Sequence, residues 1–157
     1  MLKSKFLHSV FLTLISLLLA ACSPFASTKP APQPLPSPAQ DWSAVLTQTG
    51  GFIGVDLTIE VSGDGQLTAR DQRTGRKVTG KLSPQTQSTL SRLISAMASS
   101  GGQTKQSGCA DCYLYELQVQ MNGRISYTRV DDTTLQDSDA ADLIALLKDL
   151  RDGALKR

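Results

Sequence analysis

The two cysteines at positions 109 and 112 are the residues of this sequence whose type and spacing are best suited to chemistry. A Cys-x-x-Cys pair can bind zinc, exchange thiols and disulfides, or close a structural disulfide. Zinc needs four ligands, and the chain offers too few other cysteines and histidines. A redox pair is expected at a helix N-terminus, which stabilises the thiolate, whereas Cys109 and Cys112 precede a predicted strand. Of the three readings, the pattern favours a structural disulfide formed outside the cytoplasm.

A signal sequence ending in a lipobox occupies the N-terminus. Lys3 and Lys5 give it a basic start, and the apolar run over residues 10–19 is too short for an ordinary membrane helix. The run ends in Leu-Ala-Ala-Cys at Cys22 and resembles the precursors of bacterial lipoproteins. The resemblance implies that residues 1–21 are removed and that Cys22 is acylated, with two or three acyl chains giving a stable membrane anchor. An ordinary signal peptide followed by a chance cysteine is the alternative.

The lipoprotein resemblance also predicts an address. Ser23 follows the lipobox in place of the aspartate that tends to hold such lipoproteins in the inner membrane. We therefore expect the chain in the bacterial cell envelope, facing outside the cytoplasm, and in the outer membrane where the organism has one.

Removal of residues 1–21 excludes several classes of function. It takes away the only histidine, His8, so the remaining chain cannot form a Ser-His-Asp or Cys-His site or a His-ligated metal centre. It also takes two of the 16 basic residues, leaving 14 against 14 acidic residues, a balance that gives no support for nucleic-acid binding. We expect no enzyme, no cofactor and no metal. Five aspartates are expected to be solvated turn residues, not a calcium site or a catalytic pair: Asp64, Asp71, Asp111, Asp131 and Asp132.

A proline-rich tether covers residues 22–40, which hold six of the seven prolines. Proline at nearly every second position favours an extended polyproline conformation, so about 18 residues at roughly 3.1 Å each could span about 50 Å. A proline-rich ligand for another domain is the alternative. Residues 41–157 then suffice for a single small domain with a modest core.

A predicted β-hairpin, which follows the cysteine pair, must position it. Apolar and polar residues alternate from Tyr113 to Met121, the period of a half-buried strand. Asn122-Gly123 then indicates a turn, and residues 124–132 form the return strand.

The register of this hairpin depends on the length of its loop. A three-residue loop would pair Val119 with Ile125 and Leu117 with Tyr127, so that the apolar residues of both strands share one face. A two-residue turn would leave Ile125 and Tyr127 on the polar face. We therefore predict the three-residue loop.

Two helices and a second hairpin are expected in the rest of the domain. Alternation from Gly54 to Val61, turn residues at 62–65 and a return strand at 66–70 predict the hairpin. Residues 78–82 are a candidate for a short further strand. Ser83-Pro84 predicts the start of a helix that ends near Ser99, before two glycines.

The second helix is expected from Ser138 to Arg151, with its C-terminal stop at Gly153 and with Lys148 and Arg151 in a favourable last turn. The predicted fold is α+β, an antiparallel sheet of about four strands in the order ββαββα with both amphipathic helices packed on one face. The other face is left to polar residues: Thr58, Glu60, Glu116 and Gln118.

A glycine-rich segment precedes the first predicted strand: Gly50, Gly51, Phe52, Ile53 and Gly54. In one reading it is a flexible entry with Phe52 tucked into the core, and in the other it is a recognition loop. The chain is similar to the emfourin-like family in the order of its elements. These are Gly-Gly-Phe-x-Gly ahead of an alternating strand, a Leu-rich helix after Ser-Pro, a Tyr-containing strand and a terminal Leu-rich helix. The similarity covers residues 49–150.

The emfourin-like resemblance implies a proteinaceous inhibitor of thermolysin-type (M4) metalloproteases. The lipid anchor, the proline tether and the cysteine pair depart from that family. We therefore expect a membrane-anchored, non-catalytic protein that binds another protein, with a metalloprotease as the specific candidate. The alternatives are an envelope interaction module without a protease target and a thiol-disulfide protein using Cys109 and Cys112.

Overall fold

The computed structural model describes residues 41–157, so the predicted signal sequence, the acylated Cys22 and the tether lie outside the described residues. The described residues form an α+β unit built from one sheet and two helices. The elements in chain order are β1 (Trp42–Gly50), β2 (Val55–Ser62), β3 (Gln66–Asp71), β4 (Arg76–Lys81), α2 (Pro84–Ser100), β5 (Thr104–Lys105), β6 (Tyr113–Met121), β7 (Arg124–Asp131), the 3-10 helix η1 (Leu135–Asp137) and α3 (Ala141–Leu155).

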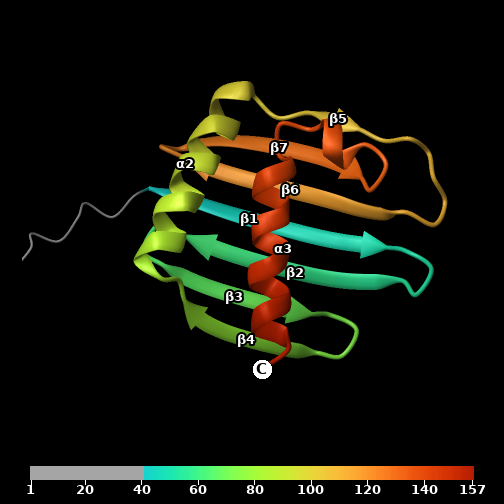
Figure 1. Cartoon of the computed structure of the whole chain (residues 1–157), viewed down its shortest axis with the longest axis horizontal. Coiled ribbons are helices and arrows are strands. Elements are labelled where there is room, and N and C mark those ends of the chain that lie inside the picture. The colour runs from blue at the N-terminus through green and yellow to red at the C-terminus, as the bar shows by residue number, and fades with distance from the viewer. Residues whose placement is uncertain (1–40) are drawn as a thin grey trace, which may run out of the picture. The chain divides into compact units, whose positions relative to one another are not determined.

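Seven strands form the sheet in the order β4-β3-β2-β1-β6-β7-β5 (Figure 1). Neighbouring strands are antiparallel except for β5, which pairs parallel to β7 and makes the sheet mixed. The predicted sheet of about four antiparallel strands was therefore too small. The central strand β1 was missed because Gln48 interrupts its inward apolar pattern and Val45 places an apolar residue on the other face. β5 has only two residues, too few to show any period.

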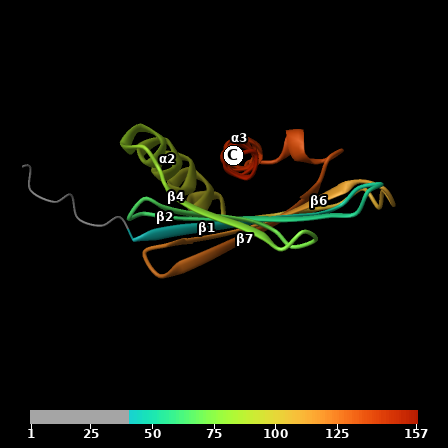
Figure 2. The ribbon, with the colours of Figure 1, turned by 90° about the horizontal axis from the view of Figure 1, so that it is seen from below.

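Both helices cover the same face of the sheet, as predicted (Figure 2). The start of α2 is as expected from the sequence, because Ser83 Oγ accepts a hydrogen bond from the Thr86 amide at 3.1 Å and Pro84 occupies the first turn. Gly101 ends α2 with a φ of 86°. The predicted ends of the second helix were wrong. The helix begins at Ala141, after η1, and passes through Gly153, which keeps a right-handed backbone, to Leu155.

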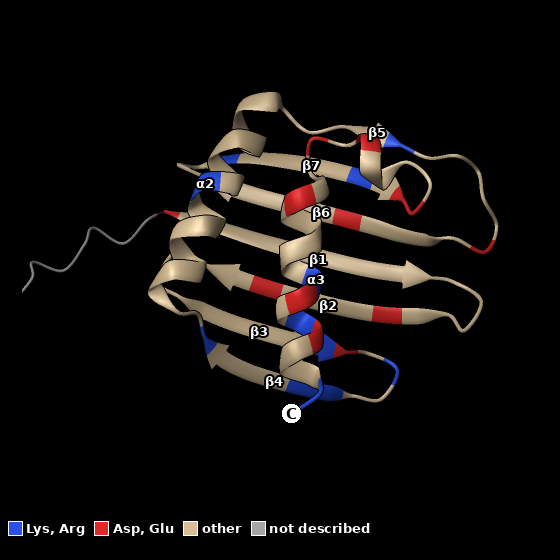
Figure 3. Ribbon diagram, viewed as in Figure 1, with Lys and Arg blue, Asp and Glu red and all other residues tan. Residues whose placement is uncertain are grey.

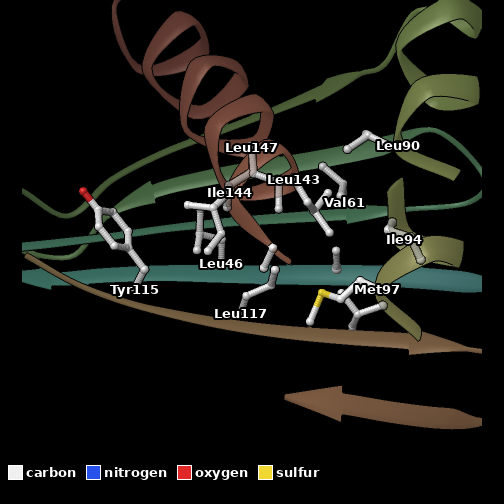
Figure 4. Close-up of a cluster of buried hydrophobic side chains, with 14 of the residues drawn as sticks. Leu46, Val61, Leu90, Ile94, Met97, Tyr115, Leu117, Leu143, Ile144 and Leu147 are labelled. Carbon is white, nitrogen blue, oxygen red and sulfur yellow. The ribbon is translucent and has the colours of Figure 1, made fainter. Parts of the chain in front are cut away.

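The hydrophobic core lies between the helices and the central strands (Figure 4). Leu46, Leu117 and Val61 point up from the sheet towards Ile144 and Leu147 of α3. α2 contributes side chains that are at most 2% exposed: Leu90, Ile94 and Met97. The opposite face of the sheet, which we call the open face, carries the polar residues that the alternation predicted.

A buried arginine lies at the edge of this core. Lys148 and Arg151 were expected in the last turn of this helix, but α3 continues to Leu155 and has no basic residue in its last turn. Arg151 is only 2% exposed. Its Nη2 donates to Gln48 Oε1 at 2.8 Å, and its Nε donates to Asp152 Oδ1 at 2.8 Å. Gln48 is the inward-facing polar residue of β1. It breaks the apolar pattern of the strand because its side chain accepts a hydrogen bond from this buried guanidinium.

The predicted register of the β6–β7 hairpin was wrong by one residue. A two-residue turn at Asn122-Gly123, with φ values of 50° and 76°, pairs Met121 with Arg124. Positive φ at both turn positions matches the strand twist, which favours this turn over the longer loop. As a result, Ile125 and Tyr127 lie on the open face, 63% and 45% exposed.

The inward face of β7 carries small polar residues because another chain segment passes close above it. Thr128 is 1% exposed, and its Oγ1 accepts a hydrogen bond from the Gln103 amide at 3.3 Å. A Cβ on Gly102 would overlap the backbone of Tyr127. This close approach leaves no room for isoleucine or tyrosine on the inner face, so packing overrides the apolar pattern.

Candidate functional site

The loop between β1 and β2 exposes two large apolar side chains of its glycine-rich segment. Phe52 is 93% exposed and Ile53 is 63% exposed. The structure therefore excludes the core position for Phe52 and leaves the recognition-loop reading. Large apolar side chains at a loop tip are unfavourable in water unless a partner covers them, which makes the tip a candidate binding surface.

Glycines give this loop a backbone that other residues would not adopt. Gly50, Gly51 and Gly54 have φ values of 84°, 70° and 61°. A Cβ on Gly50 would lie 2.7 Å from the carbonyl oxygen of Cys112, and a Cβ on Gly51 would overlap the ring of Tyr113. The glycines therefore let the loop lie directly against the start of β6.

Hydrogen bonds tie the loop to its neighbours on both sides. The Gly51 amide donates to the Cys112 carbonyl at 3.1 Å, and the Gly54 amide closes the turn on the Gly51 carbonyl at 2.9 Å. On the other side, Arg73 Nη1 donates to the carbonyl oxygen of Ile53. Arg73 lies in the β3–β4 turn, which Asp71 shapes by accepting hydrogen bonds from the amides of residues 73 and 74.

The cysteine pair lies in the segment that contacts the glycine loop. Cys109 and Cys112 form a disulfide with an S–S distance of 2.07 Å, directly before β6. The disulfide closes a ring that ends at Cys112, whose carbonyl binds Gly51. The chain continues from the cysteine pair into β6 and not into a helix, so no helix N-terminus stabilises a thiolate here.

Asp131 holds the cysteine segment in place from the end of β7. It is 5% exposed and accepts hydrogen bonds from the amide and hydroxyl of Ser107 at 2.6 and 2.9 Å. It also accepts bonds from the amides and hydroxyls of Thr133 and Thr134. The Thr133 hydroxyl, followed by the Ser107 amide, holds the pKa of Asp131 well below its usual range.

The aspartates that the sequence placed in turns are only partly as expected. Asp64 and Asp71 do shape turns, and hydrogen bonds from Ser62 and Thr74, respectively, lower their pKa values. Asp131 is a buried structural acceptor, not a solvated turn acid. A clue was available in the sequence, because Asp131 is followed by Thr133 and Thr134 at the spacing of local side-chain to backbone bonds.

A cavity of about 320 Å³ opens beside the glycine loop. Its walls come from the end of β1, the cysteine segment and the start of β6, and include Thr49, Gly50, Cys109, Cys112 and Leu114. The exposed tip of Phe52 and this hollow are joined through Gly50 and Gly51, so together they form one composite surface at the loop end of the sheet. A partner could receive Phe52 and insert a side chain of its own into the cavity.

A metal site or a membrane-spanning helix would give the described residues a different role. Among residues 41–157, no three histidine, cysteine or acidic side chains gather as a metal site, and no helix is long and apolar enough to cross a membrane. No protein-family model matches the chain, and no curated protein matches it. The site thus consists of an exposed aromatic tip and a cavity that is lined by Gly50 and by the disulfide-closed segment.

Proposed function

We propose that this chain is a lipid-anchored binding protein of the bacterial cell envelope, without catalytic activity, that binds another protein through the loop end of its sheet. The observation that carries the proposal is the 93% exposure of Phe52 on a loop braced by Gly51, Cys112 and Arg73. A braced loop loses little conformational entropy on binding, so an exposed aromatic ring there is a favourable anchor.

The position of the loop suits a tethered protein. β1 runs from Trp42, next to the first described residue, to Gly50, next to the loop. Its nine residues extend over about 27 Å at roughly 3.3 Å per step. Phe52 therefore lies at the far end of β1 from Asp41, the residue through which a membrane tether would enter the domain.

The specific candidate is inhibition of thermolysin-type metalloproteases, as in the emfourin-like family that the sequence resembles. Such an inhibitor must fill an apolar specificity pocket and resist cleavage. Phe52 and Ile53 offer apolar side chains, and the hydrogen bonds at Gly51, Gly54 and Ile53 hold the intervening backbone in one conformation. A backbone that cannot adopt the extended geometry of a substrate is a poor substrate.

Inhibition is tested with the purified chain and a thermolysin-type protease in a peptide-hydrolysis assay. A serine protease assayed in parallel is the control for nonspecific inhibition. The proposal predicts inhibition of the metalloprotease alone at micromolar or lower concentration, with the chain recovered intact. Full activity of the metalloprotease, or cleavage between Phe52 and Ile53, would contradict it.

A non-inhibitory envelope interaction module is the second candidate, and the cavity beside the loop favours it. An inhibitor that only blocks a pocket of its target needs no cavity of its own. An interface in which each protein inserts a side chain into the other uses both the exposed ring and the cavity. A thiol-disulfide activity is the third candidate, and the absence of a helix after Cys109 speaks against it.

A further inference from the structure

β4 forms an edge of the sheet, at the side furthest from the disulfide. Among the described strands its only neighbour is β3. The Leu82 amide donates to the Gly65 carbonyl at 2.8 Å, which fixes the alternation of bonded pairs along the β3–β4 ladder. The N–H and C=O groups of three β4 residues therefore point away from β3: Lys77, Thr79 and Lys81.

A groove of about 420 Å³ follows the same edge on the helix side of the sheet. Val78 and Leu82 contribute to one wall, and Leu150, Gly153 and Ala154 of α3 contribute to the other. Val78 lies opposite Ala69 of β3, whose side chain is buried beneath the helices, so Val78 faces the groove. A strand added to β4 would direct every second side chain into this groove.

The β4 edge is also the basic end of the domain (Figure 3). Lys and Arg gather on the β3–β4 hairpin and at the C-terminus, at positions 70, 73, 76, 77, 81, 156 and 157. Neither Lys77 nor Lys81 takes part in a salt bridge within residues 41–157. Both project from the open face, on either side of Thr79, where a partner can reach them. Lys81 also lies near enough to Asp64 to contribute to the lowering of its pKa.

We propose that β4 binds an extended acidic segment of another protein by antiparallel strand addition. Such a segment would use three features of this edge: backbone groups that β3 does not bond, an apolar groove, and two exposed lysines without a salt bridge. Antiparallel pairing continues the pattern of β3, β2, β1, β6 and β7. This surface is separate from the loop that carries Phe52.

Two other occupants fit the edge poorly. A second copy pairing through its own β4 would bring lysine side chains of the two copies together, and like charges across a strand pair are destabilising. The chain's own proline-rich segment, residues 22–40, lacks backbone N–H groups at its prolines and cannot form a continuous ladder.

The edge also predicts the sequence pattern of the partner. Acidic residues belong opposite Lys77 and Lys81, and apolar residues belong opposite Val78 and Gly80, where they enter the groove. Asp149 lies in the groove wall and disfavours acidic residues at those inner positions. The expected segment therefore reads acidic, apolar, any, apolar, acidic.

The test uses the full chain in detergent and a labelled peptide of sequence SEVTVES, whose symmetry makes the pattern independent of direction. Fluorescence anisotropy should detect binding that weakens about tenfold or more when Lys77 and Lys81 are both changed to Glu. A peptide with lysine in place of both glutamates should then prefer this Lys77→Glu, Lys81→Glu variant. Phe52→Ala should leave peptide binding unchanged.

Two N-methylated peptides provide the matched control for strand addition. Methylation of the central threonine amide, which pairs with Thr79, should reduce binding more than tenfold, whereas methylation of a neighbouring valine amide should have little effect. Equal effects of the two methyl groups, or no binding of the unmodified peptide, would overturn the proposal.

Discussion

The glycines on either side of Phe52 give the loop a path that leaves its ring exposed to solvent. Gly50 and Gly51 allow the chain to pass against Cys112 and Tyr113 before it turns outward, and the ring at the tip contacts little of its own domain. The exposed ring and the left-handed backbone belong to one arrangement. Gly50 and Gly51 are needed for their positive φ and for the contact with β6, whereas Gly54 is needed for its positive φ alone.

Gly51→Ala should disrupt the loop for two reasons. The new Cβ would overlap the Tyr113 ring, and the alanine would have to keep a positive φ of about 70°, which is unfavourable for it. We expect a loss of stability greater than about 1 kcal/mol in chemical denaturation and weaker partner binding. Gly75→Ala is the matched control: its φ is 72°, yet nothing lies within 4 Å of the added Cβ. Similar losses of stability in the two variants would show that contact with Tyr113 is unimportant.

Asp131→Asn should lower stability in a way that depends on pH. Hydrogen bonds from Thr133 and Ser107 depress the pKa of Asp131 in the folded state, so its ionised form stabilises the fold. That contribution is fully present above the unfolded pKa of about 4 and is lost as pH falls below it. Melting temperatures between pH 6 and pH 2 should therefore converge for the wild type and the variant. A constant difference across this range would contradict the assignment.

At the scale of the element, the sequence predicts a segment well when one local signal decides it. Ser83-Pro84 and Gly101 set the limits of α2, and alternation alone locates β2 and β6. Prediction failed where tertiary packing decides. The Asn122-Gly123 turn and the close approach of Gly102 to β7 together set the β6–β7 register, against the apolar pattern of the return strand. α3 does not stop at Gly153 but continues over β3 and β4 to Leu155.

The corrected register predicts opposite outcomes for two apolar residues of the same hairpin. Leu117→Ala should cost about 2–5 kcal/mol, because Leu117 is completely buried. Ile125→Ala should cost less than about 0.5 kcal/mol, because Ile125 lies on the open face. Urea denaturation of both variants measures this difference. A large loss with Ile125→Ala would restore the three-residue loop.

The disulfide element should matter for stability more than for chemistry. Changing Cys109 and Cys112 together to Ser should lower the free energy of unfolding by about 2 kcal/mol in the chain-entropy account of a short ring. Binding should survive at low temperature, because Asp131 still holds the segment through Ser107. An insulin-reduction activity in the wild type that disappears in the double variant would support the redox reading instead.

Across the whole domain, the core and the candidate surfaces are separated. The helices and the inner face of the sheet bury the apolar residues, while the Phe52 loop and the β4 edge lie at its margins. The sequence alone identified the Phe52 loop but did not establish its exposure, because an aromatic residue between glycines also fits a core position. It did not reveal the cavity, Arg73 or Asp131 as parts of the site, since these meet only through the sheet topology.

The central claim is that Phe52 is a binding anchor and not a core residue, and one comparison tests it most directly. Phe52→Ala should leave the melting temperature unchanged while weakening inhibition of a thermolysin-type protease, or binding to another isolated partner, by about 2 kcal/mol or more. Ile125→Ala, at an exposed apolar position on the open face, is the control and should leave binding unchanged and the melting temperature nearly so. A Phe52→Ala variant that loses about 3 kcal/mol of stability, or that binds as tightly as the wild type, would contradict the account.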